Sequence, residues 1–289
     1  MDIKIKEKLP QWFMEETPKE LILSNDIDSL LSVRLLEQVR PNWKLKYFYD
    51  FESGIYRIEN TDKKSNDIVG VDIALEKSFK TFDNHVTSDN CNGINPYSIN
   101  FNNVYGISSQ NYFRKYCGST ALLIYSLFDI PLPTSEIGKA LLLTIDSTYY
   151  SYYNSIARNR PDWLEIHQHW LCDILGFPEL YEIEQSHSME DFRQLCYIND
   201  AKIQIFDDLL DGHYQIIYPL DNKFRVEKAL DVCLEVPSES FSLVKKVRAK
   251  SCYLNGLHKS DLKDKYRILS FAMTGKKHCN FSALSNNIT

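Results

Sequence analysis

Acidic residues stand at the ends of short apolar segments in the first half of the chain. Asp26 and Asp28 follow the run LIL, Asp72 ends the segment IVGVD, and Asp83 follows the next apolar run. In an open parallel sheet the carboxyl ends of the strands form the ligand crevice, so we expect these side chains to converge there. Clustered carboxylates repel one another unless a cation lies between them. Hard oxygen ligands favour Mg²⁺ or Mn²⁺, and two such ions polarise a phosphate and generate a hydroxide nucleophile.

Three further residues extend this candidate site. Asn84 and His85 follow Asp83 directly, and Asp146 closes a later predicted helix. An aspartate after a strand is also a common turn or helix-capping residue, and each position taken alone favours that structural role. The order and context of the aspartates together favour chemistry.

The elements that would position these residues alternate along the first half of the chain. The apolar runs are too continuous for strands with a solvated face, and the segments between them show helical spacing. The pattern predicts an α/β fold with a mostly parallel sheet flanked by helices. Strands are predicted at residues 21–23, 43–51, 67–72 and 79–82, a long loop at 88–110, and helices at 29–39, 111–128 and 134–145.

The second half of the chain differs from the first in composition and in its predicted elements. A helical, Trp-rich segment surrounds residues 155–180, and a smaller α+β domain is predicted after it. Its expected strands are 202–206, 213–219, 232–236 and 266–273, with a hairpin turn at Asp211-Gly212. The predicted organisation is a domain over residues 1–155, a helical linker over 156–180, and a small substrate-closing domain over 181–289.

Composition narrows the class of protein. The net charge of −6 argues against a large sequence-independent grip on duplex DNA. Seven scattered cysteines with no CxxC pair favour reduced thiols and a cytoplasmic protein, and no apolar run is long enough for a membrane span. His167 and His169 lie two residues apart in a helical context, where a shared metal is not expected, so a structural or surface role is favoured for both.

Four segments in order resemble the motifs of the DHH phosphoesterase superfamily. LILSNDIDSLLSVRLL resembles the first motif, IVGVDIAL the second, and FDNHV the Asp-His-His signature. The stretch from CGSTALLIYSLF to TIDSTYY resembles the region around the fourth motif. Together they span residues 20–150. The resemblance implies a divergent member with two divalent ions, Mn²⁺ or Mg²⁺, acting on phosphoric esters or anhydrides.

The resemblance also assigns roles to residues. It implies that Asp26, Asp28, Asp72 and Asp146 are metal ligands, that Asp83 is the signature aspartate, and that His85 faces the substrate phosphate. Two positions depart from the family. Ser24 and Asn84 stand where metal-binding histidines are expected, and the first-motif glycine is Ser29. Asn84 offers only a neutral carbonyl oxygen, so the metal site is expected to be weakened.

Many members of the family carry a Gly-rich loop that binds substrate, and one segment of this chain weakly resembles it. In Thr274-Gly275-Lys276-Lys277-His278, two lysines replace glycines, and these lysines and His278 are candidate phosphate-binding residues. A solvated turn is the alternative interpretation.

Three functional hypotheses remain open. The first is a metal-dependent phosphoesterase acting on a nucleotide or a short single-stranded oligonucleotide. The second is a catalytically degenerate relative that binds a nucleotide or a protein partner, or assembles as a homo-oligomer. The third is an unrelated α/β domain whose aspartates are turn residues.

Overall fold

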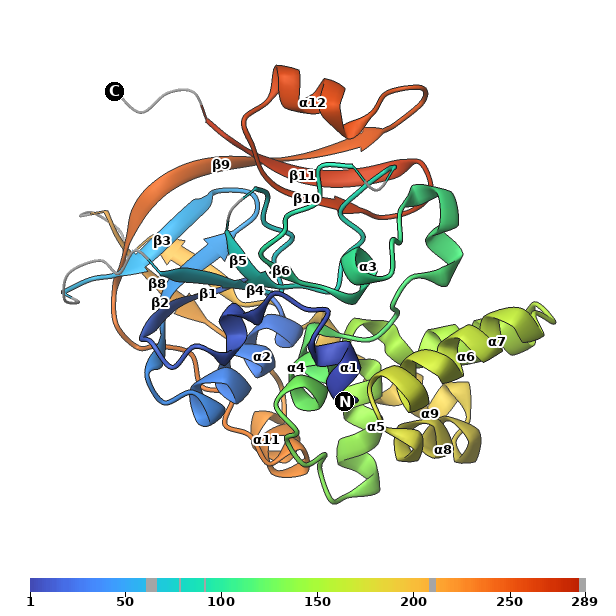
Figure 1. The fold of residues 1–289 in the computed structure, drawn as a ribbon. Coiled ribbons are helices and arrows are strands. Elements are labelled where there is room, and N and C mark those ends of the chain that lie inside the picture. The colour runs from blue at the N-terminus through green and yellow to red at the C-terminus, as the bar shows by residue number, and fades with distance from the viewer. Residues whose placement is uncertain (61–66, 78, 91, 208–211, 286–289) are drawn as a thin grey trace.

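A computed structural model describes residues 1–60, 67–77, 79–90, 92–207 and 212–285 of the chain. In the described residues, a curved mixed sheet runs in the order β10-β11-β9-β3-β2-β1-β4-β5-β6. Helices cover one face of its central strands, while β10, β11 and α12 (Lys259–Lys265) rise on the other side (Figure 1). The fold is therefore α/β with a β-rich C-terminal region.

The central strands are parallel and buried. β1 pairs with β2 on one side and with β4 on the other, and β5 and β6 continue the parallel order. Every residue of β1 is buried, as expected for a strand covered on both faces. All their carboxyl ends therefore meet at one edge of the sheet. The bounds are β1 Lys19–Leu23, β2 Trp43–Asp50, β4 Ile68–Val71, β5 Lys80–Phe82 and β6 Ser98–Ile99.

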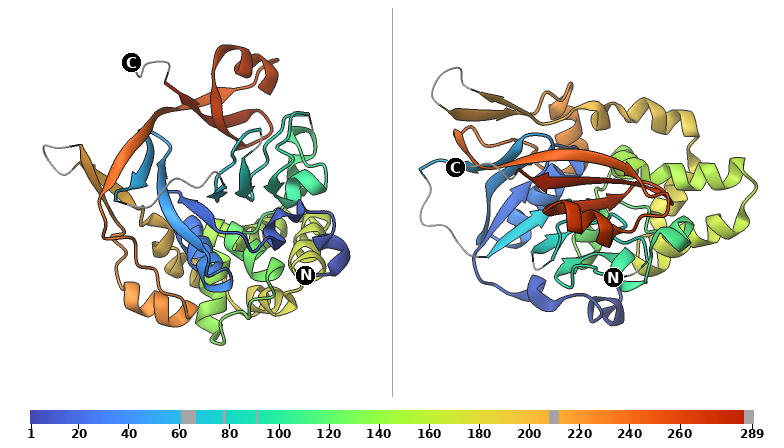
Figure 2. Two further views of the ribbon diagram at one scale, coloured as in Figure 1. Left: turned by 60° about the vertical axis from the view of Figure 1, so that its left-hand side comes forward. Right: turned by 90° about the horizontal axis from the view of Figure 1, so that it is seen from above.

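The remaining strands are antiparallel. β3 (Gly54–Ile58) pairs with β2 and with β9 (Phe241–Tyr253), and β9 then pairs with β11 (His278–Leu284), which pairs with β10 (Ile268–Met273). A hairpin of β7 (Gln204–Asp207) and β8 (His213–Ile217) joins β9. Figure 2 shows β9 arching between the two regions. Because these pairs are antiparallel and continue the parallel strands, the sheet as a whole is mixed rather than mostly parallel.

The helices bury one large apolar core against the sheet. α2 (Ile27–Val39) and α4 (Thr120–Leu127) lie directly below it and pack on each other (Figure 1). The others include α5 (Glu136–Thr144), α6 (Thr148–Ala157), α7 (Pro161–Gln168), α8 (Pro178–Ser186), α9 (Met189–Leu195) and α11 (Lys223–Leu230). Short helices are α1 (Ile3–Lys6), α3 (Phe101–Val104) and α10 (Tyr197–Asp200), with 3-10 or π turns η1 (Gln11–Met14), η2 (Ser109–Arg114), η3 (Ile145–Ser147) and η4 (His169–Ile174).

Several element predictions need correction. Residues 232–236 form no strand, although they are apolar, because no neighbouring strand pairs with them. The helix predicted over 111–128 divides into η2 and α4, since the Ser119 side chain caps α4 by accepting a hydrogen bond from Leu122 N–H. Strands β3, β9 and β11 were not predicted. The division into separate domains stays a prediction, and both Asp211 and Cys91 lie outside the described residues.

Among the described residues, no helix is both long and apolar enough to cross a membrane.

Candidate metal site

Three aspartates from separate parts of the chain meet at the carboxyl ends of the parallel strands. Asp28 lies in the first turn of α2, Asp72 follows β4, and Asp146 lies in η3 after α5. One carboxylate oxygen from each lies within 4.8 Å of the others. We call these three residues the acidic cluster. The predicted convergence is confirmed for them, and the spacing is small enough for one cation to contact all three.

Asp28 has a structural role as well as a place in the cluster. Its two carboxylate oxygens accept hydrogen bonds from the backbone N–H groups of Thr120 and Ala121, each at 2.7 Å. These N–H groups open α4, and the positive end of a helix favours a carboxylate. A carboxylate accepts about four hydrogen bonds or metal contacts, so this capping leaves lone pairs for a cation.

The backbone turns sharply at the two other members of the cluster. Asp72 has a φ of 57° and Asp146 a φ of 52°, both in the left-handed region that aspartate tolerates better than most residues. Thr120 Oγ1 donates a hydrogen bond of 2.8 Å to Asp72 Oδ1 and fixes that side chain. Backbone conformations of this kind concentrate at functional sites.

The fourth predicted ligand, Asp26, belongs to the same electrostatic environment. It is the N-cap of α2, and its carboxylate accepts the Ser29 N–H. Burial, followed by the charge of Asp146, raises its pKa. Its capping role fits the structural interpretation. Asp26 is not among the three carboxylates that lie within 4.8 Å of one another, so its role as a metal ligand stays a prediction.

The carboxylates of the acidic cluster raise one another's pKa. Burial, followed by the charges of Asp72 and Asp146, holds the pKa of Asp28 well above its ordinary value. Burial, followed by the charges of Asp26 and Asp146, does the same to the pKa of Asp72. Buried carboxylates that resist ionisation in the apo protein are what a cation-binding site requires, because the ion removes the repulsion.

Asp83 and His85 form a rigid pair beside the cluster. Asp83 is fully buried; its Oδ1 lies 2.7 Å from His85 Nδ1, and its Oδ2 accepts a hydrogen bond of 2.7 Å from Asn100 Nδ2. The imidazole itself is 37% exposed. Burial alone would lower the pKa of His85, but the hydrogen bond and charge of Asp83, followed by the charge of Asp72, raise it to about 10. His85 therefore presents a positive charge at neutral pH.

The two positions that depart from the DHH pattern are buried and only partly satisfied. Asn84 Nδ2 donates to Gly118 O at 3.1 Å and to Asp146 Oδ2. Within the described chain, however, Asn84 Oδ1 and Ser24 Oγ have no hydrogen-bond partner. A buried oxygen without a partner calls for a bound group. The amide nitrogen of Asn84, not its oxygen, faces Asp146, so a ligand role for Asn84 stays a prediction. The three carboxylates alone are an all-oxygen donor set that fits Mg²⁺ or Mn²⁺.

Ser29, which stands at the first-motif glycine, links two strand tips. Its hydroxyl accepts the Ser24 N–H and donates to Val71 O, each at 2.8 Å. The hydroxyl therefore holds the ends of β1 and β4 together.

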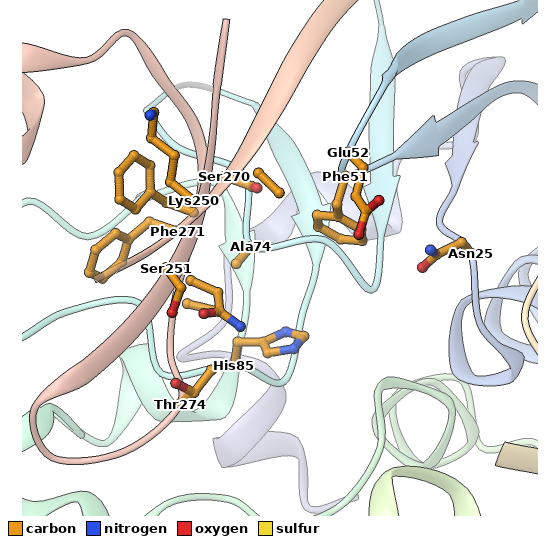
Figure 3. A pocket seen from close by; sticks show the side chains of 14 residues that line it. Asn25, Phe51, Glu52, Ala74, His85, Lys250, Ser251, Ser270, Phe271 and Thr274 are labelled. Atoms are coloured by element: carbon orange, nitrogen blue, oxygen red, sulfur yellow. The ribbon is translucent and has the colours of Figure 1, made fainter. Parts of the chain in front are cut away.

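A pocket of about 470 Å³ lies between the strand tips and the C-terminal strands. Figure 3 shows the His85 imidazole beside Ser251 and Thr274, with Phe51 and Asn25 facing them from the other side. His85 lines this pocket, whereas Asp28, Asp72 and Asp146 are not among its lining residues. Asp146 lines a neighbouring pocket of about 230 Å³ together with Asn84 and His85. The lining of the larger pocket also includes Glu52, Lys250, Phe271, Asn280 and Phe281.

The predicted substrate-binding turn lies near this pocket but is exposed. Met273 N–H donates to Val86 O at 2.7 Å, which places the β10–β11 turn beside His85. Of the turn's residues, Thr274 lines the pocket, whereas Lys276, Lys277 and His278 are exposed. Their role in phosphate binding stays a prediction.

Sequence reasoning did not identify the neutral residues that hold the site. Asn100 fixes Asp83, and Thr120 fixes Asp72. The segment Gly118-Ser119-Thr120 does carry a helix-start signal, which could have placed the α4 N-terminus. Nothing in the sequence shows that this helix start faces Asp28, since 92 residues separate Asp28 from Thr120.

The chain matches no protein-family model, and neither the curated proteins nor the solved structures contain a significant match to it.

Proposed function

We propose that the acidic cluster binds divalent cations, Mn²⁺ or Mg²⁺, and that the protein hydrolyses a phosphoric ester or anhydride of a nucleotide or short oligonucleotide. The observation that carries this proposal is the convergence of Asp28, Asp72 and Asp146 within 4.8 Å. Asp26, whose pKa is raised by the charge of Asp146, would supply a fourth carboxylate and complete a two-ion site.

Bound divalent ions would polarise the phosphate and lower the pKa of a coordinated water. The chain's own groups would act around them. His85, held by Asp83, would place its positive charge against the phosphate as negative charge develops on the non-bridging oxygens. Asp83 is a positioning residue in this scheme, because Asn100 and His85 occupy its oxygens.

The pocket supports a substrate with an aromatic base. Phe51 offers partly exposed aromatic surface, whereas Phe271 and Phe281 are buried behind the pocket wall. Ser251, Thr274 and Asn280 offer polar groups for a sugar or phosphate. An aromatic ring contributes roughly 1–3 kcal/mol per stacked base. We also infer that the region after residue 181 acts as the small closing domain of the DHH organisation, and that the protein works in the cytoplasm.

The resemblance of four ordered segments to the DHH motifs supports the same reaction class. The strand-to-helix turn with Asp26 and Asp28, the single Asp72 after β4, and Asp83 with His85 stand in the family's order. Ser24 and Asn84 reduce the ligand set, which predicts weaker metal affinity than two histidines would give.

The test is hydrolysis of model phosphodiesters, dinucleotides and pyrophosphate with Mn²⁺ or Mg²⁺. Asp72→Asn keeps the size of the side chain but removes its charge, and we expect it to lower the rate by roughly 100-fold or more. Asp162→Asn, at an exposed aspartate in α7, is the matched control and should retain the rate. Equal rates for the wild type and Asp72→Asn would remove the proposal.

Ser24 and Asn84 favour a second candidate function, a binding subunit that keeps the cleft and lacks turnover. Titration calorimetry with Mn²⁺ separates the two. Stoichiometric cation binding with hydrolysis supports the enzyme, whereas nucleotide binding without cation binding or hydrolysis supports the binding subunit.

A further inference from the structure

We propose that Cys117, His167 and Glu184 form a second reactive centre, in which the Cys117 sulfur is a nucleophile that is acylated by small esters or thioesters. Cys117 Sγ lies 3.1 Å from His167 Nδ1, and His167 Nε2 lies 2.7 Å from Glu184 Oε2. This nucleophile–base–orienting-acid geometry is that of covalent catalysis. We call these residues the thiolate triad; the site is separate from the proposed phosphoesterase chemistry.

Three elements far apart in sequence assemble the thiolate triad. Cys117 precedes α4, His167 lies in the last turn of α7, and Glu184 lies in α8. The His167 and Glu184 side chains are 1% and 0% exposed, whereas Cys117 is partly exposed. The base and the acid are thus enclosed, and the sulfur is the member that a ligand can reach.

The charges of the thiolate triad favour an ion pair between sulfur and imidazole. Burial alone would raise the pKa of Cys117, but the charge of His167 and its hydrogen bond lower it below the ordinary value. Burial alone would lower the pKa of His167, but the charges of Cys117 and Glu184 raise it to about 10. A thiolate is the nucleophilic form of cysteine.

The sulfur opens onto a pocket that suits a short acyl group. The pocket measures about 170 Å³, and its apolar side chains are those of Phe113, Trp163 and Ile166. Lys115 supplies a positive charge for a developing oxyanion. Trp163 Nε1 is buried without an acceptor in the described residues and leaves a donor for a bound carbonyl oxygen.

The chemistry balances with an ester and water as the only reactants. The Cys117 thiolate forms a C–S bond to the acyl carbon, the C–O bond to the alcohol breaks, and the His167 imidazolium gives its proton to the leaving oxygen. Neutral His167 then removes a proton from water, whose oxygen attacks the thioester carbon. The C–S bond breaks, the carboxylic acid leaves, and the thiolate and imidazolium are restored.

The test uses p-nitrophenyl acetate and the full chain. We expect a burst of about one p-nitrophenolate per chain and a single acetyl group on Cys117, located by peptide mass spectrometry. Cys117→Ala should abolish the burst. His167→Gln should slow acylation by roughly 100-fold, while His169→Gln, at the neighbouring exposed histidine, should leave it unchanged. Acetylation of Cys233, an exposed cysteine, at the rate of Cys117 would overturn the proposal.

A second measurement needs no variant and so does not depend on the folding of His167→Gln. Alkylation by iodoacetamide at pH 6.5 should be at least about tenfold faster at Cys117 than at Cys233. The titratable groups that influence how the Cys117 alkylation rate depends on pH are Lys115 and Tyr116 near the sulfur, and Glu184, Tyr152 and Tyr181 near the imidazole. A Cys117 rate that rises with pH only as an ordinary thiol would also overturn the proposal.

Discussion

The acidic cluster and the thiolate triad lie next to neighbouring pockets that share lining residues. Tyr112, Lys115 and Cys117 line both the pocket of the triad and the pocket that contains Asp146. The two sites differ in the signs of the charges that they bring together. The acidic cluster brings carboxylates together with no cationic side chain among its three members. The thiolate triad alternates thiolate, imidazolium and carboxylate along one line of contacts.

This difference shows which site is complete within the chain. Like charges in a buried site cost stability until an external cation joins them. Alternating charges satisfy one another, and removing one member leaves an unpaired buried charge. The acidic cluster should therefore respond to cations in solution, and the thiolate triad should respond to substitution.

The largest effect is expected at the carboxylate of the thiolate triad. Glu184→Gln removes one of the two negative charges beside the His167 imidazolium and leaves Cys117 as the other, and we expect a loss of about 3 kcal/mol in the free energy of unfolding. Because the folded pKa of His167 is raised from 6.5 to about 10, the stability that its imidazolium contributes is lost as pH rises through about 10. Burial raises the pKa of Glu184, so the pair is also lost at acidic pH, when this carboxylate is protonated. Urea unfolding at several pH values measures it.

The matched control is Glu182→Gln, an exposed glutamate on the same helix. It should change the unfolding free energy by less than about 0.5 kcal/mol. If both variants lost stability equally, the charge pairing of the thiolate triad would not stabilise the fold.

The next effect comes from adding a cation. Mn²⁺ at about 100 times its dissociation constant should stabilise the protein by about 2.7 kcal/mol, which corresponds to roughly 5–10 °C in Tm. The raised pKa values of Asp28 and Asp72 make the cluster's repulsion grow as pH rises above the ordinary value of 3.8, so the cation should stabilise more at pH 7.5 than at pH 5. Thermal unfolding with and without Mn²⁺ measures this, and a Tm that ignores Mn²⁺ at pH 7.5 would contradict it.

A smaller effect of opposite sign is expected when a charge leaves the acidic cluster. In EDTA, Asp72→Asn should raise the unfolding free energy by about 1 kcal/mol, because it removes repulsion and keeps an oxygen to accept from Thr120. With Mn²⁺ the order should reverse. Asp28→Asn is the informative comparison, since an amide cannot accept both α4 N–H groups through oxygen, and this variant should lose stability even in EDTA.

The parallel part of the fold was predictable because its signals are local. Residues of β1 and β4 form unbroken apolar runs, and α2 shows helical spacing after a capping aspartate. β9 was missed because its segment carries four lysines and arginines and only two of its 13 residues are buried; its strand state comes from pairing with β3, about 190 residues earlier. Residues 232–236 failed for the converse reason, since apolar composition without a partner strand makes no strand.

The two sites also differ in how far local sequence signals predict them. Asp28 and Asp72 were predictable because parallel strands and their following helices bring strand ends to one edge, whereas Asp146 follows α5 and was assigned through the resemblance. Cys117, His167 and Glu184 have no shared motif, and the packing of α7 and α8 beside Cys117 decides their contact. His167, for which a structural or surface role was predicted, is buried in this contact, whereas His169 is exposed and pairs with Asp173.

The smallest expected effect is on KM, and it distinguishes the role of the predicted substrate turn from that of the acidic cluster. Lys276 and Lys277 are exposed on the β10–β11 turn, so their charge acts on a phosphate through solvent and is screened by salt. Replacing both by alanine should raise KM for a dinucleotide about two- to fivefold at low salt and leave kcat unchanged, whereas Asp72→Asn should lower kcat. Replacing Lys4 and Lys228, two exposed lysines, by alanine removes the same two charges and is the control for net charge. A KM change that persists at 0.5 M salt would mean that these lysines contact the substrate directly, because a direct contact is screened far less than long-range attraction.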